Sequence, residues 1–125
     1  KAKHLSYIGD SVVGNNVNFG AGTQLANYRF DAKNVVTYLK SGWVNTGTHK
    51  LGSIIGDNTK FGVLSSVMPG KLVGNDCWIG SGVVLGKNLS SNKHIFVRQD
   101  YTIIDKELDE STKEQNQKNT ATKNK

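Results

Sequence analysis

An apolar residue, usually followed by glycine or another small residue, recurs at every sixth position along most of this chain. The N-terminal block contains Val13-Gly14, Phe19-Gly20 and Leu25-Ala26, and the second block contains Ile55-Gly56, Phe61-Gly62, Val67-Met68, Val73-Gly74, Ile79-Gly80 and Leu85-Gly86. Neither an α-helix, with 3.6 residues per turn, nor an alternating strand repeats at six residues. The period is typical of a hexapeptide repeat.

In such a repeat each hexad forms one side of a three-sided coil. One apolar side chain per hexad is expected to point into a shared interior, and glycine or a small residue is expected to let the backbone turn sharply. Three hexads, about 18 residues, complete one turn, and successive turns pair as parallel strands so that no hexad buries its apolar residue alone. The sequence therefore predicts an all-β fold, a parallel β-helix.

The rhythm divides the chain into regions. Residues 1–104 are expected to form one domain, with a hairpin loop leaving the coil over about 28–50, where two short apolar stretches flank Ser41-Gly42. Residues 105–125 are polar, so we expect a short helix around Leu108 followed by a disordered end. Because the chain begins with Lys1 and opens directly on a motif, we expect it to be a piece of a longer protein.

The chain is basic, with a formal net charge of +6, and the excess lies within residues 1–104. Because the basic residues are scattered and no nucleic-acid-reading module is evident, phosphate-bearing small molecules are expected as ligands rather than nucleic acid. The single cysteine, Cys77, cannot form an internal disulfide, and no Cys/His spacing indicates a metal site. With no membrane-spanning segment or secretory signal in the sequence, we expect a cytoplasmic setting and no membrane partner.

Three segments carry a more specific pattern. They are Lys3-His4-Leu5-Ser6-Tyr7-Ile8-Gly9-Asp10, Val17-Asn18-Phe19-Gly20-Ala21-Gly22-Thr23 and Ala26-Asn27-Tyr28. Together they resemble the acetyltransferase domain of the bifunctional enzymes that make UDP-N-acetylglucosamine, in particular the archaeal sugar-1-phosphate nucleotidyltransferases with amino-sugar acetyltransferase activity. The resemblance covers roughly residues 1–100. It implies a left-handed coil and a homotrimer with sites between neighbouring coils. It also implies acetyl transfer from acetyl-CoA to the amino group of glucosamine 1-phosphate or, in some archaeal members, galactosamine 1-phosphate.

The same resemblance implies site residues. The implied catalytic residues are His4, Asn27 and Lys33, the sugar-phosphate ligands are Tyr7, Asn18 and Lys33, and the acetyl-CoA contacts are Ala21, Asn27, Tyr28 and Ser81. A histidine suits the reaction because it can accept the proton that the attacking amine loses. The donor to the developing oxyanion is left open between a backbone N–H of residues 20–22 and the Asn27 amide. Val36 and His49 depart from the archaeal pattern, which carries a second basic residue and often arginine at these positions.

Two other functions share this coil. One is a non-catalytic trimerisation or regulatory domain of a sugar-1-phosphate nucleotidyltransferase, which would not require the His4 motif or Asn27. The other is a trimeric carbonic anhydrase, which needs three histidines converging on zinc. His4, His49 and His94 are about 45 residues apart and do not suit one site, so no metal is expected.

Overall fold

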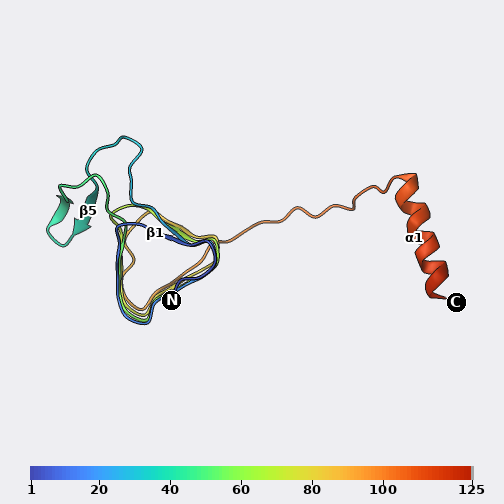
Figure 1. Cartoon of the computed structure of the whole chain (residues 1–125), viewed down its shortest axis with the longest axis horizontal. Helices are drawn as coiled ribbons and strands as arrows, with labels where there is room; N and C mark the ends of the chain where they lie inside the picture. Colours follow the sequence, from blue (N-terminus) through green and yellow to red (C-terminus); the bar gives the residue numbers. More distant parts are fainter. Residues whose placement is uncertain (125) are drawn as a thin grey trace.

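The computed structural model describes residues 1–124, most of which form a three-sided coil of two-residue strands (Figure 1). The coil strands are β1 (Tyr7–Ile8), β2 (Val12–Val13), β3 (Asn18–Phe19), β4 (Gln24–Leu25), β7 (Ile54–Ile55), β8 (Lys60–Phe61), β9 (Ser66–Val67), β10 (Leu72–Val73), β11 (Trp78–Ile79), β12 (Val84–Leu85) and β13 (His94–Ile95). They make three parallel sheets, one per side of the coil, ordered β1-β4-β9-β12, β10-β7-β2 and β13-β11-β8-β3.

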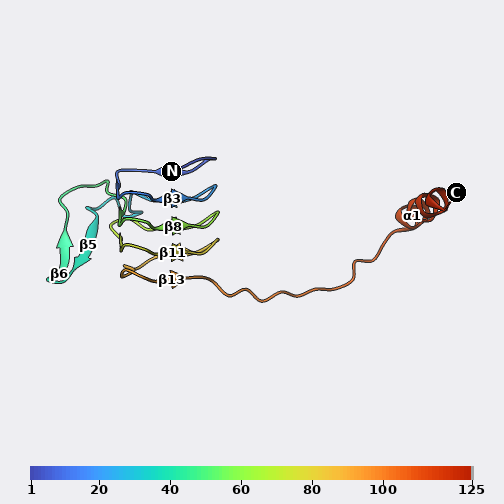
Figure 2. The same cartoon turned by 90° about the horizontal axis from the view of Figure 1, so that it is seen from below.

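The register of these sheets confirms the predicted β-helix. Ile54 pairs with Leu72 and Lys60 with Trp78, so these partners on neighbouring turns are 18 residues apart. Figure 2 shows the turns stacked along one axis from the N-terminal end to β13. The coil winds in the left-handed sense that the resemblance implies.

The coil interior holds two side chains per hexad rather than the one expected. The aliphatic and aromatic positions are at most 5% exposed, and they include Phe19, Leu25, Ile55, Phe61, Val67, Val73, Ile79 and Leu85. A second buried position lies two residues earlier in each hexad and is usually small or hydroxylated, as at Thr23, Ser53, Thr59, Ser65 and Cys77. The Thr23 hydroxyl donates to the Gly20 carbonyl at 2.7 Å and the Ser65 hydroxyl to the Gly62 carbonyl at 2.8 Å. These local hydrogen bonds satisfy the hydroxyls of Thr23 and Ser65 inside the coil, whereas the buried Ser53 hydroxyl has no hydrogen-bond partner among the described residues.

The glycine after each aliphatic residue has a different role from the one predicted. A Cβ at Gly56 would lie 2.3 Å from Asn75 Oδ1 and 2.7 Å from Asn75 N on the next turn. The left-handed backbone conformation falls two residues later, as at Asn58 with φ of 58° and Asp76 with φ of 56°. Asparagine and aspartate tolerate that conformation better than most residues. The glycine therefore permits close stacking of turns, while the corner is made by the later residue.

A glycine pair tests this assignment. We expect Gly56→Ala to lower the free energy of unfolding by about 1–3 kcal/mol, because the added methyl group overlaps the backbone of the next turn. Gly86 follows Leu85 in the same hexad position, but a Cβ there would meet nothing within 4 Å. Gly86→Ala is the matched control, and its unfolding midpoint in urea should stay close to that of the wild type. Equal losses in the two variants would contradict the stacking role.

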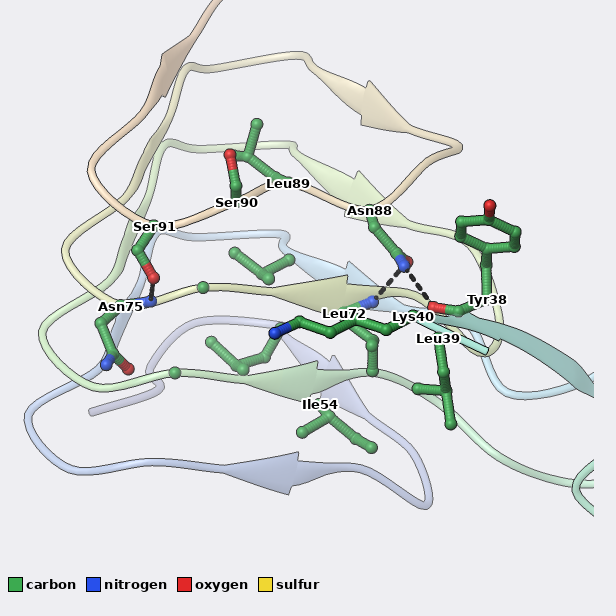
Figure 3. A pocket seen from close by; sticks show the side chains of 14 residues that line it. Tyr38, Leu39, Lys40, Ile54, Leu72, Asn75, Asn88, Leu89, Ser90 and Ser91 are labelled. Atoms are coloured by element: carbon green, nitrogen blue, oxygen red, sulfur yellow. Dashed lines mark hydrogen bonds between the residues drawn. The ribbon is translucent and has the colours of Figure 1, made fainter. Parts of the chain in front are cut away.

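The ejected hairpin is also present. The pairing of β3 with β8 spans 42 residues, 24 more than one turn, and the insertion contains β5 (Val36–Leu39) paired antiparallel with β6 (Gly42–Asn45). Asn88 holds the hairpin to the coil, since its Nδ2 donates to the Tyr38 carbonyl at 2.8 Å and its Oδ1 accepts from the Leu72 N–H at 2.9 Å (Figure 3). The Lys71 ammonium lies 5.6 Å from the centre of the Trp43 ring. The hairpin is thereby fixed against the coil side made by β7 and β10.

The C-terminal segment leaves the coil and ends in α1 (Glu110–Lys123) (Figure 1). The helix is longer than expected, covers residues that we expected to be disordered and begins after Leu108. Asp109 caps it by accepting from the Thr112 N–H at 2.8 Å, and this hydrogen bond lowers the pKa of Asp109. No α1 residue is buried, because a polar composition prevents burial but not a locally capped helix. Lys125 lies outside the described residues, and the domain boundary near residue 104 stays a prediction.

Within residues 1–124, no helix combines the length and the apolar content that crossing a bilayer would require.

Candidate functional site

One corner of the coil stacks several of the predicted site residues. The Gly22 N–H donates to the His4 carbonyl at 3.0 Å, the Leu64 N–H to the Ala21 carbonyl at 2.8 Å, and the Gly82 N–H to the Val63 carbonyl at 3.0 Å. These equivalent bonds place His4, Ala21 and Val63 at the same position of successive turns, and Ser81 follows one 18-residue period after Val63. We call His4, Ala21, Val63 and Ser81 the corner column. Neighbouring turns are about 4.8 Å apart, so the column runs parallel to the coil axis.

The His4 end of the column opens into a small hollow of about 260 Å³. Its lining includes His4, Asn18 and Ala21 together with Lys1 and Lys3. His4 is exposed and precedes β1, with φ of 59°. The hollow therefore presents an accessible imidazole next to an amide and two ammonium groups, a set suited to a polar ligand that carries negative charge.

The Ser81 end of the column lies in a groove of about 420 Å³. One wall is formed by Val63, Leu64 and Ser81, and the other by Val97, Gln99 and Tyr101 of the segment that leaves the coil. Leu64 is 71% exposed and has φ of 56°, which is uncommon for a bulky residue. Sequence reasoning missed the second wall, because no motif in residues 97–101 connects them with the repeat.

Asn27, Tyr7 and Asp10 form a separate cluster. The Asn27 amide donates to the Tyr7 hydroxyl oxygen at 3.0 Å and to Asp10 Oδ2 at 2.5 Å. Asp10 was not among the predicted site residues, although it closes the motif that begins at Lys3. Because its carboxylate and the Tyr7 hydroxyl fix the Asn27 amide nitrogen, the amide oxygen is left as the acceptor for a ligand.

Lys33 lies in the loop that precedes the hairpin. It lines a hollow of about 630 Å³ with Arg29, Val36 and His49. Arg29 pairs with Asp31 through Nε–Oδ1 and Nη2–Oδ2 contacts of 2.8 and 2.5 Å, and this guanidinium holds the pKa of the Asp31 carboxyl well below its usual range. Since Asp31 compensates the charge of Arg29, Lys33 supplies the uncompensated positive charge of the hollow.

Tyr28 lies at the base of the same loop. It forms an antiparallel bridge with Lys50 and lines an apolar hollow with Phe30, Met68 and Pro69. It does not line either hollow of the corner column.

The predicted site residues thus fall on two edges of the coil. His4, Asn18, Ala21 and Ser81 lie on the corner edge, whereas Asn27, Tyr28 and Lys33 lie on the loop edge, where the Tyr7 hydroxyl also points. β1 and β4 run parallel as neighbours in one sheet, and His4 precedes β1 whereas Asn27 follows β4. His4 and Asn27 are therefore at opposite ends of the same coil side. One chain does not bring them together.

No group of three or more His, Cys, Asp or Glu side chains among residues 1–124 is arranged to hold a metal ion.

Comparison with known proteins agrees with this architecture. Residues of the chain are 46% identical over 100 positions to a bifunctional protein GlmU of Methanocaldococcus jannaschii, covering 80% of this chain and 24% of that protein. They are 42% identical over 89 positions to a bifunctional sugar-1-phosphate nucleotidylyltransferase/acetyltransferase of Sulfurisphaera tokodaii, covering 71% of this chain and 22% of that protein. The chain thus spans about a quarter of the length of the curated relatives it matches. No family model matches the chain.

A solved structure shares the fold. Serine acetyltransferase isoform 3 of Entamoeba histolytica, crystallised with cysteine, superposes with a TM-score of 0.58 at 19% identity, covering 86% of this chain and 31% of that one. At this identity the likeness concerns the fold alone. The sequence relatives confirm the resemblance that the three N-terminal segments indicate.

Proposed function

Because the chain is homologous to a segment of the bifunctional sugar-1-phosphate nucleotidylyltransferase/acetyltransferases, we propose that it transfers the acetyl group of acetyl-CoA to the amino group of glucosamine 1-phosphate, with galactosamine 1-phosphate as a second acceptor. The observation that carries this proposal is the corner column, which stacks an exposed imidazole with Ala21 and Ser81 along one edge. A cytoplasmic location belongs to the same proposal.

The chemistry assigns His4 one step. The amino nitrogen of the sugar attacks the thioester carbonyl carbon, a C–N bond forms, and the nitrogen loses a proton. His4 accepts that proton as the general base. When the tetrahedral intermediate collapses, the C–S bond breaks, the amide remains on the sugar and the thiolate leaves with CoA. The exposed column beyond His4 offers the CoA arm a path along the axis past Ala21 and Leu64 to Ser81.

We propose that the two edges meet between protomers. A head-to-tail ring places the corner edge of one subunit against the loop edge of the next, and rotation closes such a contact into a cyclic oligomer. Three protomers give the homotrimer implied by the resemblance. In that ring His4 and Asn18 of one chain face Asn27 and Lys33 of its neighbour.

Lys33 is expected to hold the sugar phosphate from the loop. Lys33→Ala should raise the KM for glucosamine 1-phosphate by about 10- to 100-fold, because one charge-assisted hydrogen bond to the phosphate is lost. Lys33→Arg should restore most of the affinity. Lys118→Ala, an exposed lysine on α1, is the matched control and should leave the KM near that of the wild type. A KM unchanged in Lys33→Ala would contradict the phosphate role.

The reaction itself is tested by measuring CoA thiol release from acetyl-CoA with glucosamine 1-phosphate, galactosamine 1-phosphate and glucosamine 6-phosphate in parallel. Release with the 1-phosphates, together with the N-acetylated sugar by mass spectrometry, supports the proposal. If neither this chain nor a longer protein that contains it releases CoA, the result would favour the non-catalytic trimerisation domain instead.

A further inference from the structure

The segment between the coil and α1 exposes large apolar side chains. Residues 99–109, which we call the strap, run extended away from the coil (Figure 2). Within it Ile103 is 90% and Ile104 is 81% exposed, whereas Tyr101, nearer the coil, lines the groove at the Ser81 end of the corner column. Extended segments that expose several large apolar groups are a common form of ligand for a groove on another surface.

A groove of about 810 Å³ lies on the far side of the coil, between the hairpin and the coil side made by β7 and β10 (Figure 3). We call it the hairpin groove. Leu39 of the hairpin, Ile54 of β7 and Leu72 of β10 contribute apolar surface to it, and Lys40 also lines it. Asn88 and Lys71 fix its hairpin wall through the contacts described above, so the groove is held open by the native structure.

Strap and groove are complementary in charge as well as polarity. The strap contains one lysine and four carboxylates, a formal charge of −3, whereas residues 1–98 contain eleven basic and four acidic residues, a formal charge of +7. Lys40 and Lys71 lie at the hairpin. An acidic, apolar strap therefore matches an apolar groove that is lined by Lys40 and belongs to a basic domain, which favours association with this surface over association between two straps.

The strap leaves the coil at the corner edge, and the hairpin lies at the opposite side (Figure 1). Complementary surfaces on opposite sides of one chain are what a head-to-tail ring requires. We propose that the strap of one protomer occupies the hairpin groove of the next protomer in the ring. This inference rests on the proposed homotrimer. It names the strap as the segment that joins neighbouring protomers.

Cross-linking of the full-length chain tests the inference. Ile104→Cys is placed in the strap and Leu39→Cys in the groove; the native Cys77 is completely buried and does not compete in the folded protein. The two single variants are mixed, reassembled and treated with a short bismaleimide. We expect products that join the strap thiol of one chain to the groove thiol of another in the mixture, and a ladder up to trimer in the double variant. Each single variant alone should give at most the background of the wild type.

Two outcomes would overturn the proposal. An internal cross-link in the double variant, without products of higher mass, would show that the strap contacts the hairpin groove of its own chain. A mixture that is no more cross-linked than the single variants would show that the strap does not occupy the hairpin groove. As a second measurement, the protein concentration at which the oligomer dissociates is determined by analytical sedimentation. In the variant that combines Ile103→Asp and Ile104→Asp, this concentration should be about tenfold higher than in the wild type, or more. Gln117→Asp, which adds a carboxylate on exposed α1, is the control. Acetyl transfer by the wild-type chain is measured separately, so a failed cross-link in an active protein counts against the strap alone.

Discussion

Replacing His4 with alanine is expected to lower kcat for acetyl transfer by about 100- to 10,000-fold, because a positioned general base contributes that much to the rate. The fold should be unaffected, since His4 is exposed and precedes β1. The measurement is CoA release at saturating substrates, accompanied by a thermal unfolding curve. His4→Gln should be equally slow, because glutamine can form hydrogen bonds but cannot accept the proton.

His94 provides the control for this variant. It lies on β13 with its ring 5.5 Å from that of Trp78, at the far end of the coil from His4. His94→Ala should keep kcat close to the wild-type value. Retention of more than a tenth of the wild-type kcat in a folded His4→Ala protein would remove His4 from the proton transfer and with it the assignment of the column as a catalytic edge.

Mixing two inactive variants is expected to restore activity. His4→Ala and Asn27→Ala chains should each be inactive alone, because each lacks one half of every site. In randomly mixed trimers made from equal amounts, about one quarter of the interfaces pair an intact His4 with an intact Asn27 from the neighbouring chain. The mixture, unfolded together and refolded, should therefore recover about one quarter of wild-type turnover per site.

The same chains mixed without exchange of subunits are the control, and they should stay inactive. A further control combines His4→Ala and Asn27→Ala in one chain and mixes it with an equal amount of wild type. This mixture also leaves about one quarter of the interfaces intact if the residues act across chains, but half of the sites if they act within one chain. No recovery in the first mixture, together with half the activity in the second, would place both residues of a site in one protomer.

The repeat in the sequence was enough to predict the coil. A β-helix gives each hexad the same environment, so the same residue types recur at every sixth position. Leu25, Ile55 and Leu85 could be assigned to the interior from spacing alone, and the structure buries all three. The buried hydroxyl residues could not be assigned in that way. Thr23 and Ser65 are inside because their hydroxyls bond to carbonyls at the coil corner, and a composition rule treats such residues as exposed.

In the C-terminal segment, composition predicted the exposure of the side chains but not the length of the helix. Its polarity correctly indicates that α1 buries nothing. The extent of the helix depends instead on a local cap at Asp109 and the Glu110–Lys113 contact of 3.1 Å, which are weak signals in a sequence of this composition.

For the candidate site, the N-terminal motifs predicted which residue types take part, since the proposed acyl transfer needs a base, polar ligands and a cation regardless of their placement. Where those residues lie relative to one another followed from the three-dimensional path of the chain. The 17-residue register between β1 and β4 and the 24-residue insertion before β7 send His4 and Ser81 to one edge and Asn27 and Lys33 to the other. The sequence gives the order of residues along the chain. The path of the folded coil determines which edge each strand end reaches, and therefore that the corner edge and the loop edge of one chain lie apart.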